Sequence, residues 1–190
     1  MSSHHFVKED QEPAVLIADA SAIPFAVVEQ LLEWSPTVVV LEQALDSVIA
    51  WGIKLDVVVG HLQHEEELRE KVNDQAPVKI LNHKPGDDPL ATAIYFLRAG
   101  RYRAVNVIGA SPSDLVTFIE GMDVVCFHEL KRWSFARTGI FEKWYARGHS
   151  LHISINRFSS TGLTDDLVTA QDGLVKIEAS IPFWIGEDYS

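Results

Sequence analysis

Cysteine is almost absent from this sequence. The only one among its 190 residues is Cys126, which lies in the apolar run MDVVCF. A single cysteine excludes a disulfide within the chain, so nothing indicates an oxidising compartment. The first residues, MSSHHFVKEDQEP, are polar and lack the apolar core of a secretory signal. We therefore expect a cytoplasmic protein.

Basic residues are scarce too, and no apolar stretch is long. Sixteen Lys and Arg stand against 27 Asp and Glu, which gives a formal net charge of −11. A surface that binds nucleic acid needs clustered basic side chains, so we expect no nucleic-acid partner. No apolar run approaches the roughly 20 residues that cross a bilayer, so no membrane partner is expected. Hydrophobic residues make up 47% of the chain, which is typical of a folded globular protein.

Residues 14 to about 127 alternate between two patterns. Short runs rich in β-branched residues read as buried strands, and they begin at Ala14, Thr37, Asp56, Val78, Ala104 and Met122. Apolar residues at helical spacing lie between them, as in Phe25, Val28 and Leu32, in Leu68 and Val72, and in Leu90, Ile94 and Leu97. Strands that alternate with helices predict an α/β fold with a mainly parallel, doubly wound sheet.

After about Ser134 the pattern changes to a period of two. The segments LHISIN and VKIEASI alternate apolar and polar residues, which predicts strands with one buried face and no helix. Asp172-Gly173 is typical of a hairpin turn. We expect an α/β domain over residues 1–130 and a small antiparallel, β-sandwich-like domain over 131–190. The apolar cluster Phe183, Trp184 and Ile185 on so small a domain predicts a covering surface and hence a homodimer.

Ligands of an open parallel sheet bind beyond the carboxyl ends of its strands. Four predicted loops follow a strand and precede a helix there, at residues 19–22, 60–64, 83–88 and 109–114. Helix N-termini in these loops would favour phosphate. None of the loops carries a known phosphate fingerprint, since the chain has neither a Walker loop nor G-x-G-x-x-G.

Several of these loop residues also have a purely structural explanation. Asp88 before Pro89 is a good helix cap, and Ser111 with Asp114 fits a capping box. Asp19 is harder to explain as a cap. His61, His64 and His83 could gather at one edge and bind a transition metal, but their spacing matches no standard metal motif, which favours solvated loop residues.

Taken together, the loops resemble those of the thiamin pyrophosphokinase family. Its first strand ends in an aspartate loop, similar to IADASA here, and its third runs into Gly-Asp-x-Asp-Ser, where this chain has GHLQH. A Lys-Asp-x-Thr-Asp segment then opens a helix, as HKPGDDPLATAI does. A strand ending Gly-Ala before Gly-Arg-x-Asp-His is similar to VIGASPSDL, and a later Gly-Leu is similar to Gly162-Leu163.

The resemblance implies an α/β domain followed by a β-sandwich, transfer of pyrophosphate from ATP to thiamin, Mg²⁺ held by carboxylates, and a homodimer. The departures concern the carboxylates. His61 and Gln63 stand where the family has two metal aspartates, and His64 where it has the serine. Ser111 or Ser113 replaces an arginine. Mg²⁺ prefers hard oxygen ligands, and imidazole or amide substitutes poorly for carboxylate.

Three hypotheses remain open from the sequence. The first is an active thiamin pyrophosphokinase with a rebuilt site that uses Mg²⁺ and ATP. Its catalytic residues would be His61, Asp88 and Asp114, its nucleotide-binding residues Asp19, Lys84, Ser111 and Ser113, and its metal ligands Asp87 and Asp88. The second is a catalytically silent homologue that binds a nucleotide or a thiamin-like small molecule. The third is a different transferase or hydrolase on this fold that uses the histidine-rich loop.

Overall fold

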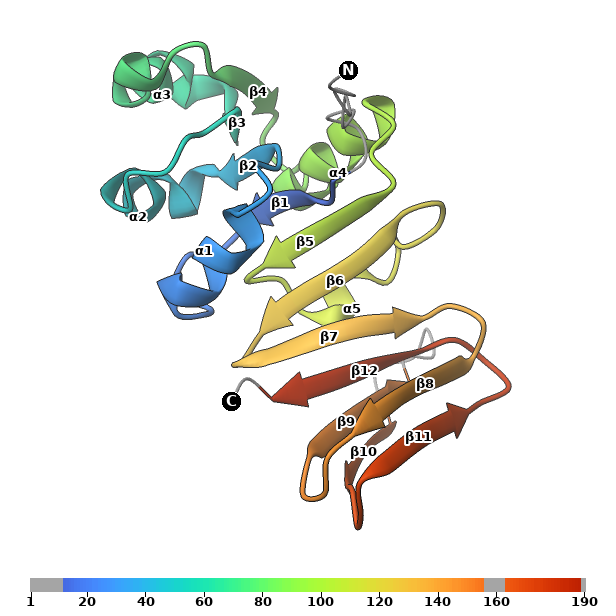
Figure 1. Ribbon diagram of the computed structural model, residues 1–190. Helices are drawn as coiled ribbons and strands as arrows, with labels where there is room; N and C mark the ends of the chain where they lie inside the picture. Colours follow the sequence, from blue (N-terminus) through green and yellow to red (C-terminus); the bar gives the residue numbers. More distant parts are fainter. Residues whose placement is uncertain (1–11, 156–162, 189–190) are drawn as a thin grey trace, which may run out of the picture.

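The computed structural model of this chain describes residues 12–155 and 163–188. Its centre is a ten-stranded sheet in the order β10-β9-β12-β7-β6-β5-β1-β2-β3-β4, and a two-stranded sheet, β11-β8, accompanies it. Figure 1 shows helices gathered around one half of the large sheet and strands alone in the other half. Within the described residues, no helix is long and apolar enough to cross a membrane.

Residues 14–128 build the parallel part of this sheet. Its elements are β1 (Ala14–Ile17), α1 (Phe25–Leu32), β2 (Val38–Leu41), η2 (Glu42–Ala44), α2 (Leu45–Ala50), β3 (Val57–His61), η3 (Leu62–His64), α3 (Glu65–Lys71), η4 (Asn73–Gln75), β4 (Lys79–His83), α4 (Pro89–Ala99), β5 (Ala104–Ile108), α5 (Pro112–Leu115) and β6 (Asp123–His128). Every pairing from β4 to β6 is parallel. The predicted α/β fold is confirmed.

Helices cover both faces of the parallel strands because successive strand residues point to opposite sides. Val15 and Ile17 of β1 pack in one core with side chains of α1, α2 and α3. Leu16 packs in the other with α4 and α5. Both faces of β1 are buried, which explains why its sequence is an unbroken apolar run rather than an alternating one.

Beyond residue 130, every helix or strand element in the part that the structure describes is a strand. Its elements are β7 (Lys131–Ala136), β8 (Ile140–Tyr145), β9 (Ser150–Ile155), β10 (Leu163–Val168), β11 (Gly173–Glu178) and β12 (Phe183–Asp188). The large sheet continues without a break from β6 into antiparallel β7 through the turn Glu129-Leu130, whose φ angles are 51° and 58°. Positive φ at both central residues is the type I′ pattern of two-residue hairpins. The division into domains at residue 130 stays a prediction.

Two expectations about the segment from β7 to β12 were wrong. Asp172-Gly173 does not close a hairpin, because β10 pairs with β9 while β11 pairs with β8 in the other sheet. The turn carries the chain from one sheet to the other. The cluster at Phe183 is not a surface awaiting a partner either, since Phe183, Trp184 and Ile185 are 1%, 0% and 0% exposed. β12 is a central strand between β7 and β9, and both of its faces are covered.

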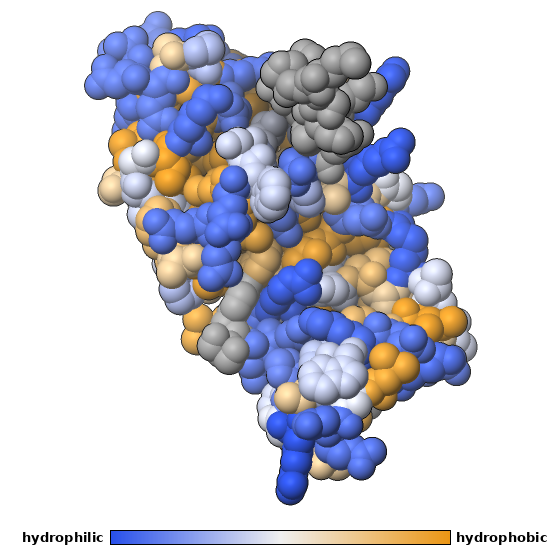
Figure 2. Space-filling view, viewed as in Figure 1, coloured by the Kyte–Doolittle hydropathy of each residue, from blue (hydrophilic) through white to orange (hydrophobic). Residues whose placement is uncertain are grey.

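The two-stranded sheet lies in front of β9 and β10 in Figure 1 and covers one face of β12. Its inner side chains, Tyr145 and Val175 among them, pack on Phe183 and Ile185. Its outer side carries the cross-strand pair Trp144 and Leu174, which are 60% and 63% exposed. Figure 2 shows apolar atoms at the surface in this region, at the lower right.

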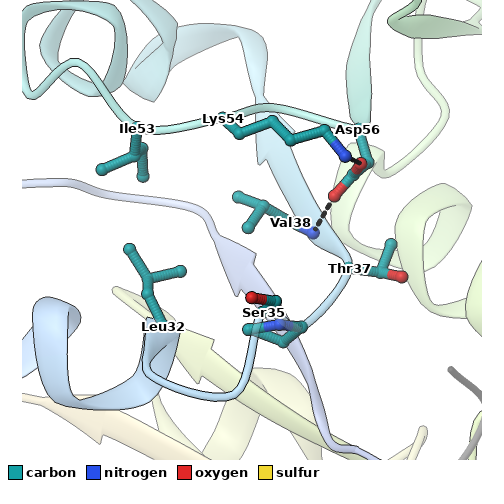
Figure 3. A pocket seen from close by; sticks show the side chains of 8 residues that line it. Leu32, Ser35, Thr37, Val38, Ile53, Lys54 and Asp56 are labelled. Carbon is teal, nitrogen blue, oxygen red and sulfur yellow. Dashed lines mark hydrogen bonds and ion pairs between the residues drawn. The ribbon is translucent and has the colours of Figure 1, made fainter.

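Asp56 ties together the starts of three parallel strands. Its Oδ2 accepts the backbone N–H of Val38 at 2.9 Å, and its own N–H donates to the Val38 carbonyl at 3.1 Å. Its carbonyl accepts from the N–H of Lys79 at 2.9 Å. Lys54 Nζ lies 3.1 Å from Oδ1. Figure 3 shows the carboxylate between Lys54 and the Val38 backbone.

We predict that Asp56→Ala lowers the free energy of unfolding by about 1.5–3 kcal/mol, the range for hydrogen bonds to charged groups. Asp56→Asn keeps an acceptor and should lose less. Urea denaturation measures both. Asp46→Ala is the control, because it removes an exposed carboxylate that forms only a surface ion pair with Lys71. Equal losses for Asp56→Ala and Asp46→Ala would contradict the prediction.

Candidate functional site

The parallel strands end at one edge of the sheet, as the fold requires. β1 is followed by Asp19, β2 by Glu42, and β5 by Gly109, while β3 and β4 end in His61 and His83. The chain runs outward from β1 to β4 and then returns through α4 to β5 on the other side of β1. The strand order therefore reverses between β1 and β5, the place where open α/β sheets bind ligands.

Asp19 and Gly109 meet at this reversal point. The N–H of Asp19 donates to the Ile108 carbonyl at 3.2 Å. Gly109 has φ +85°, and a Cβ on it would lie 2.4 Å from the Cβ of Asp19, so only glycine allows this approach. Oδ1 of Asp19 accepts from the N–H and the hydroxyl of Ser21 at 2.8 and 2.7 Å. The carboxylate thus closes its own turn.

Ser111, Ser113 and Asp114 form a second local group, after β5. Oδ2 of Asp114 accepts from the N–H and hydroxyl of Ser111 at 3.0 and 2.7 Å, and Ser111 Oγ accepts from the Asp114 N–H at 3.3 Å. Ser111 Oγ also lies 2.7 Å from Ser113 Oγ. The expected capping box is confirmed.

Burial, and then the Asp114 carboxylate, raises the pKa of the Cys126 thiol, which disfavours a thiolate nucleophile here.

The loop after β4 forms a third group. Asp87 Oδ2 accepts from the Lys84 N–H at 3.1 Å, and the Asp87 N–H donates to the Lys84 carbonyl at 3.0 Å. Asp88 Oδ1 accepts from the Leu90 N–H at 2.8 Å and caps α4, with Pro89 in its first turn. The structural explanation of Asp88 is confirmed. All three side chains, Lys84 included, are exposed.

Histidines gather at the ends of β3 and β4. The ring centroids of His61 and His64 lie 5.4 Å apart, and those of His61 and His83 also lie 5.4 Å apart. His61 and His83 are register partners on neighbouring strands, which explains the second contact. The sequence prediction that the three histidines share one edge is correct.

Glu42, which the sequence reasoning missed, organises this histidine cluster. Its Oε2 accepts from the His61 backbone N–H at 2.8 Å, and its Oε1 lies 2.5 Å from His64 Nδ1. Desolvation by burial opposes ionisation of Glu42, but the His61 N–H, the His64 bond and the charges of His64 and His83 together lower its pKa. The sequence could have indicated Glu42, because this residue directly follows a predicted parallel strand, where ligand-binding residues are expected.

The residues at this edge do not fit a preassembled Mg²⁺ site. Within residues 12–155 and 163–188, no three His, Cys, Asp or Glu side chains are grouped so as to hold a metal ion. The strand end where the resemblance places two carboxylates presents His61 and Gln63. Asp87 and Asp88, the expected ligands, hold their own loop and helix. Gly162 of the resemblance lies outside the described residues.

The structure also has a cavity of about 390 Å³ at the opposite edge of the sheet (Figure 3). It opens between the end of α1 and the segments that lead into β2 and β3, and its walls include Leu32, Thr37 and Ile53. Its charged groups, Lys54 and Asp56, already neutralise each other. None of the residues predicted to form the site lines it. We interpret it as a gap between α1 and the starts of β2 and β3 rather than as a ligand site.

Comparisons with solved structures show which known fold this is. Thiamin pyrophosphokinase from Candida albicans aligns with a TM-score of 0.68 over 97% of this chain and 91% of that one, at 8% identity. The Geobacillus thermodenitrificans enzyme gives 0.64 over 93% and 98%, at 9% identity. The Bacillus subtilis enzyme gives 0.63 over 94% and 99%, at 8% identity. No protein-family model and no curated protein matches the sequence. The chain therefore has the thiamin pyrophosphokinase fold.

We predict that Glu42→Ala lowers the free energy of unfolding near neutral pH by about 1–3 kcal/mol, because it leaves the His61 N–H and His64 without their acceptor. The folded pKa of Glu42 is lowered from 4.5. The contribution is therefore complete above that value and disappears as pH falls through the lowered pKa.

Urea denaturation of wild type and variant at about pH 7 and about pH 3.5 measures this difference. Glu29→Ala on the exposed side of α1 is the control and should show no such trend. A difference between wild type and Glu42→Ala that grows toward acidic pH would contradict the assignment.

Proposed function

We propose that this protein is a divergent thiamin pyrophosphokinase homologue that binds a phosphate-bearing small molecule, a nucleotide or thiamin diphosphate, at the carboxyl edge of its parallel strands. It does so without the Mg²⁺-dependent pyrophosphate transfer that the resemblance implies. The observation that supports this most directly is the histidine cluster around Glu42. It occupies the strand end at which metal-binding carboxylates would be needed.

Three features of the edge support an anionic ligand. The reversal between β1 and β5 leaves a loop on each side, and Asp19 in one loop and Ser113 in the other are exposed. Imidazole groups donate hydrogen bonds to phosphate oxygens, and the Lys84 side chain is exposed in the neighbouring loop. Phosphoryl transfer depends on charge neutralisation by metal and basic groups, and the edge retains basic groups while the end of β3 presents His61 and Gln63 where metal carboxylates would be needed.

Calorimetry tests this proposal directly. Thiamin, thiamin diphosphate, ATP and AMP are each titrated with Mg²⁺ and with EDTA, and AMP formation from ATP plus thiamin is assayed in parallel. We expect the phosphate-bearing ligands to bind about as well in EDTA as in Mg²⁺, and thiamin to bind more weakly. Thiamin-dependent AMP formation that needs Mg²⁺ would establish the active kinase instead.

A double variant, His61→Asp with Gln63→Asp, sharpens the test. It places two hard ligands beside ionised Glu42, and we expect Mg²⁺-dependent ATP binding to strengthen by about 1–3 kcal/mol, the scale of charge-assisted contacts. Gln30→Asp with Asn73→Asp adds acid residues away from the edge and serves as the control. If the first pair gains no more than the control, the GHLQH loop is not at metal-ligand positions.

We further propose a symmetric homodimer in the cytoplasm that uses the outer face of the β8–β11 sheet. Trp144 and Leu174 support this choice, since they form an exposed apolar cross-strand pair, and Ile140, which is 51% exposed, lies on the same face beyond the Glu142–Lys176 pair. Exposed apolar surface of this kind marks a site for interaction, and in a two-fold dimer the same surface of both chains meets. Phe183, Trp184 and Ile185 take no part in this interface, because their side chains are buried within the chain.

Light scattering at micromolar concentration should give twice the 21.2-kDa chain mass for the wild type. Trp144→Glu with Leu174→Glu places like charges across the two-fold axis and should give the single-chain mass. Trp34→Glu with Tyr95→Glu changes two exposed aromatic side chains elsewhere and should leave the mass unchanged. A wild-type protein with the single-chain mass would rule the dimer out.

A further inference from the structure

The hydrogen bonds of the histidine cluster assign a proton to each ring. Glu42 is a carboxylate and can only accept, so His64 donates through Nδ1–H at 2.5 Å. In the neutral ring Nε2 then carries the lone pair. The His64 side chain is 50% exposed, so this lone pair is open to solvent and to ligand. A carboxylate that fixes the Nδ1–H of a histidine orients the ring and stabilises its protonated form during proton transfer.

The two neighbouring histidines take complementary roles. Nδ1 of His61 accepts from the Gln63 backbone N–H at 3.2 Å, so the ring proton of neutral His61 lies on Nε2, where it is a donor. Nδ1 of His83 lies 3.2 Å from the Lys84 carbonyl and must donate to it. Side by side, the cluster therefore offers a hydrogen-bond donor at His61 and a proton acceptor at His64.

Glu42 is itself fixed from two sides. The His61 backbone N–H holds Oε2, and Leu68 of α3 lies over Gly60, where a Cβ would come within 2.3 Å of Leu68 Cδ1 and 3.0 Å of Glu42 Oε2. A side chain at Gly60 would therefore crowd chiefly Leu68, and it would also press on the Glu42 carboxylate. Glu65, the acid that directly follows His64 in the chain, is engaged elsewhere, by Arg69 and Asn82. Because Glu65 makes these other hydrogen bonds, the carboxylate that pairs with His64 is that of Glu42.

We propose that Glu42 and His64 form a proton-transfer pair and that the site hydrolyses a phosphoric anhydride of its ligand without a metal ion. This inference rests on the proposed binding of a phosphate-bearing ligand at this edge. Water attacks the terminal phosphorus and loses a proton to Nε2 of His64. The bond between that phosphorus and the bridging oxygen breaks, and the shortened ligand leaves with the electron pair. Inorganic phosphate is the second product, and the proton returns to solvent.

The other groups have defined parts in this step. His61 donates through Nε2–H to a phosphate oxygen and offsets part of the charge that develops in the transition state. Glu42 is a positioning residue, because it touches His64 and not the ligand. Substrates are molecules with at least two linked phosphates, such as ATP or thiamin diphosphate, whereas AMP binds without reacting because it has no anhydride.

Phosphate release from ATP and from thiamin diphosphate in EDTA tests the inference, with AMP as the unreactive ligand. His64→Gln should lower kcat by about 10²–10⁴-fold, the usual contribution of a general base, with ligand affinity largely kept. Glu42→Gln should lower kcat by about 10–100-fold, the range for residues that orient a functional histidine. His64→Gly should regain activity with added imidazole, which a purely structural role does not explain.

His152→Gln is the matched control, since His152 of β9 forms another histidine–carboxylate pair, with Nδ1 2.7 Å from the Asp166 carboxylate in the antiparallel part of the sheet, and should keep full activity. Circular dichroism confirms that each variant is folded. Ligand binding without phosphate release overturns this inference and leaves the proposed function intact, as does release that His64→Gln and His64→Gly do not reduce. Absence of binding by every phosphate-bearing ligand overturns both.

Discussion

A parallel strand cannot join its neighbour through a tight turn, so the chain must leave each of β1 to β5 at one edge and return through a crossover to the other. This constraint places five chain exits side by side. They bring together residues as distant in the sequence as Asp19 and Gly109, or Glu42 and His64. The two buried cores that flank β1 hold the strands in place, and the loops at the edge inherit their positions from them.

The chemistry of that edge differs from what the resemblance implies, first because β3 leads into His61 and Gln63 rather than into two carboxylates. Asp19, Asp87, Asp88 and Asp114 are all present in these loops, but each accepts hydrogen bonds from its own loop or helix. A carboxylate oxygen has several lone pairs, so these bonds do not forbid ligand contact. They show that each aspartate stabilises its own loop or helix end even without a ligand. The groups that meet between strands are instead Glu42 and three histidines.

The strand-rich part joins the parallel part through the pairing of β6 with β7, and a second connection comes from the packing of β12. Its alternating side chains enter two different cores: Trp184 packs in the one beneath α4 and α5, and Phe183 and Ile185 pack beneath the β8–β11 sheet. One continuous sheet therefore runs from β4 to β10, and the small sheet closes over its far half. The apolar surface left over belongs to the outer side of that small sheet rather than to β12.

The sequence by itself determined the elements and their caps. Hydrophobic period is a local property, so the runs at Ala14 and Ala104, the change to period two after Ser134 and the caps at Asp88 and Ser111 were all readable. Tertiary structure alone decided which strands pair. The Asp172-Gly173 turn looks like a hairpin, yet the strands on either side of it belong to different sheets. Likewise the position of Glu42 beside His64 depends on β2 and β3 lying in register, a contact between residues 22 apart that no local pattern encodes.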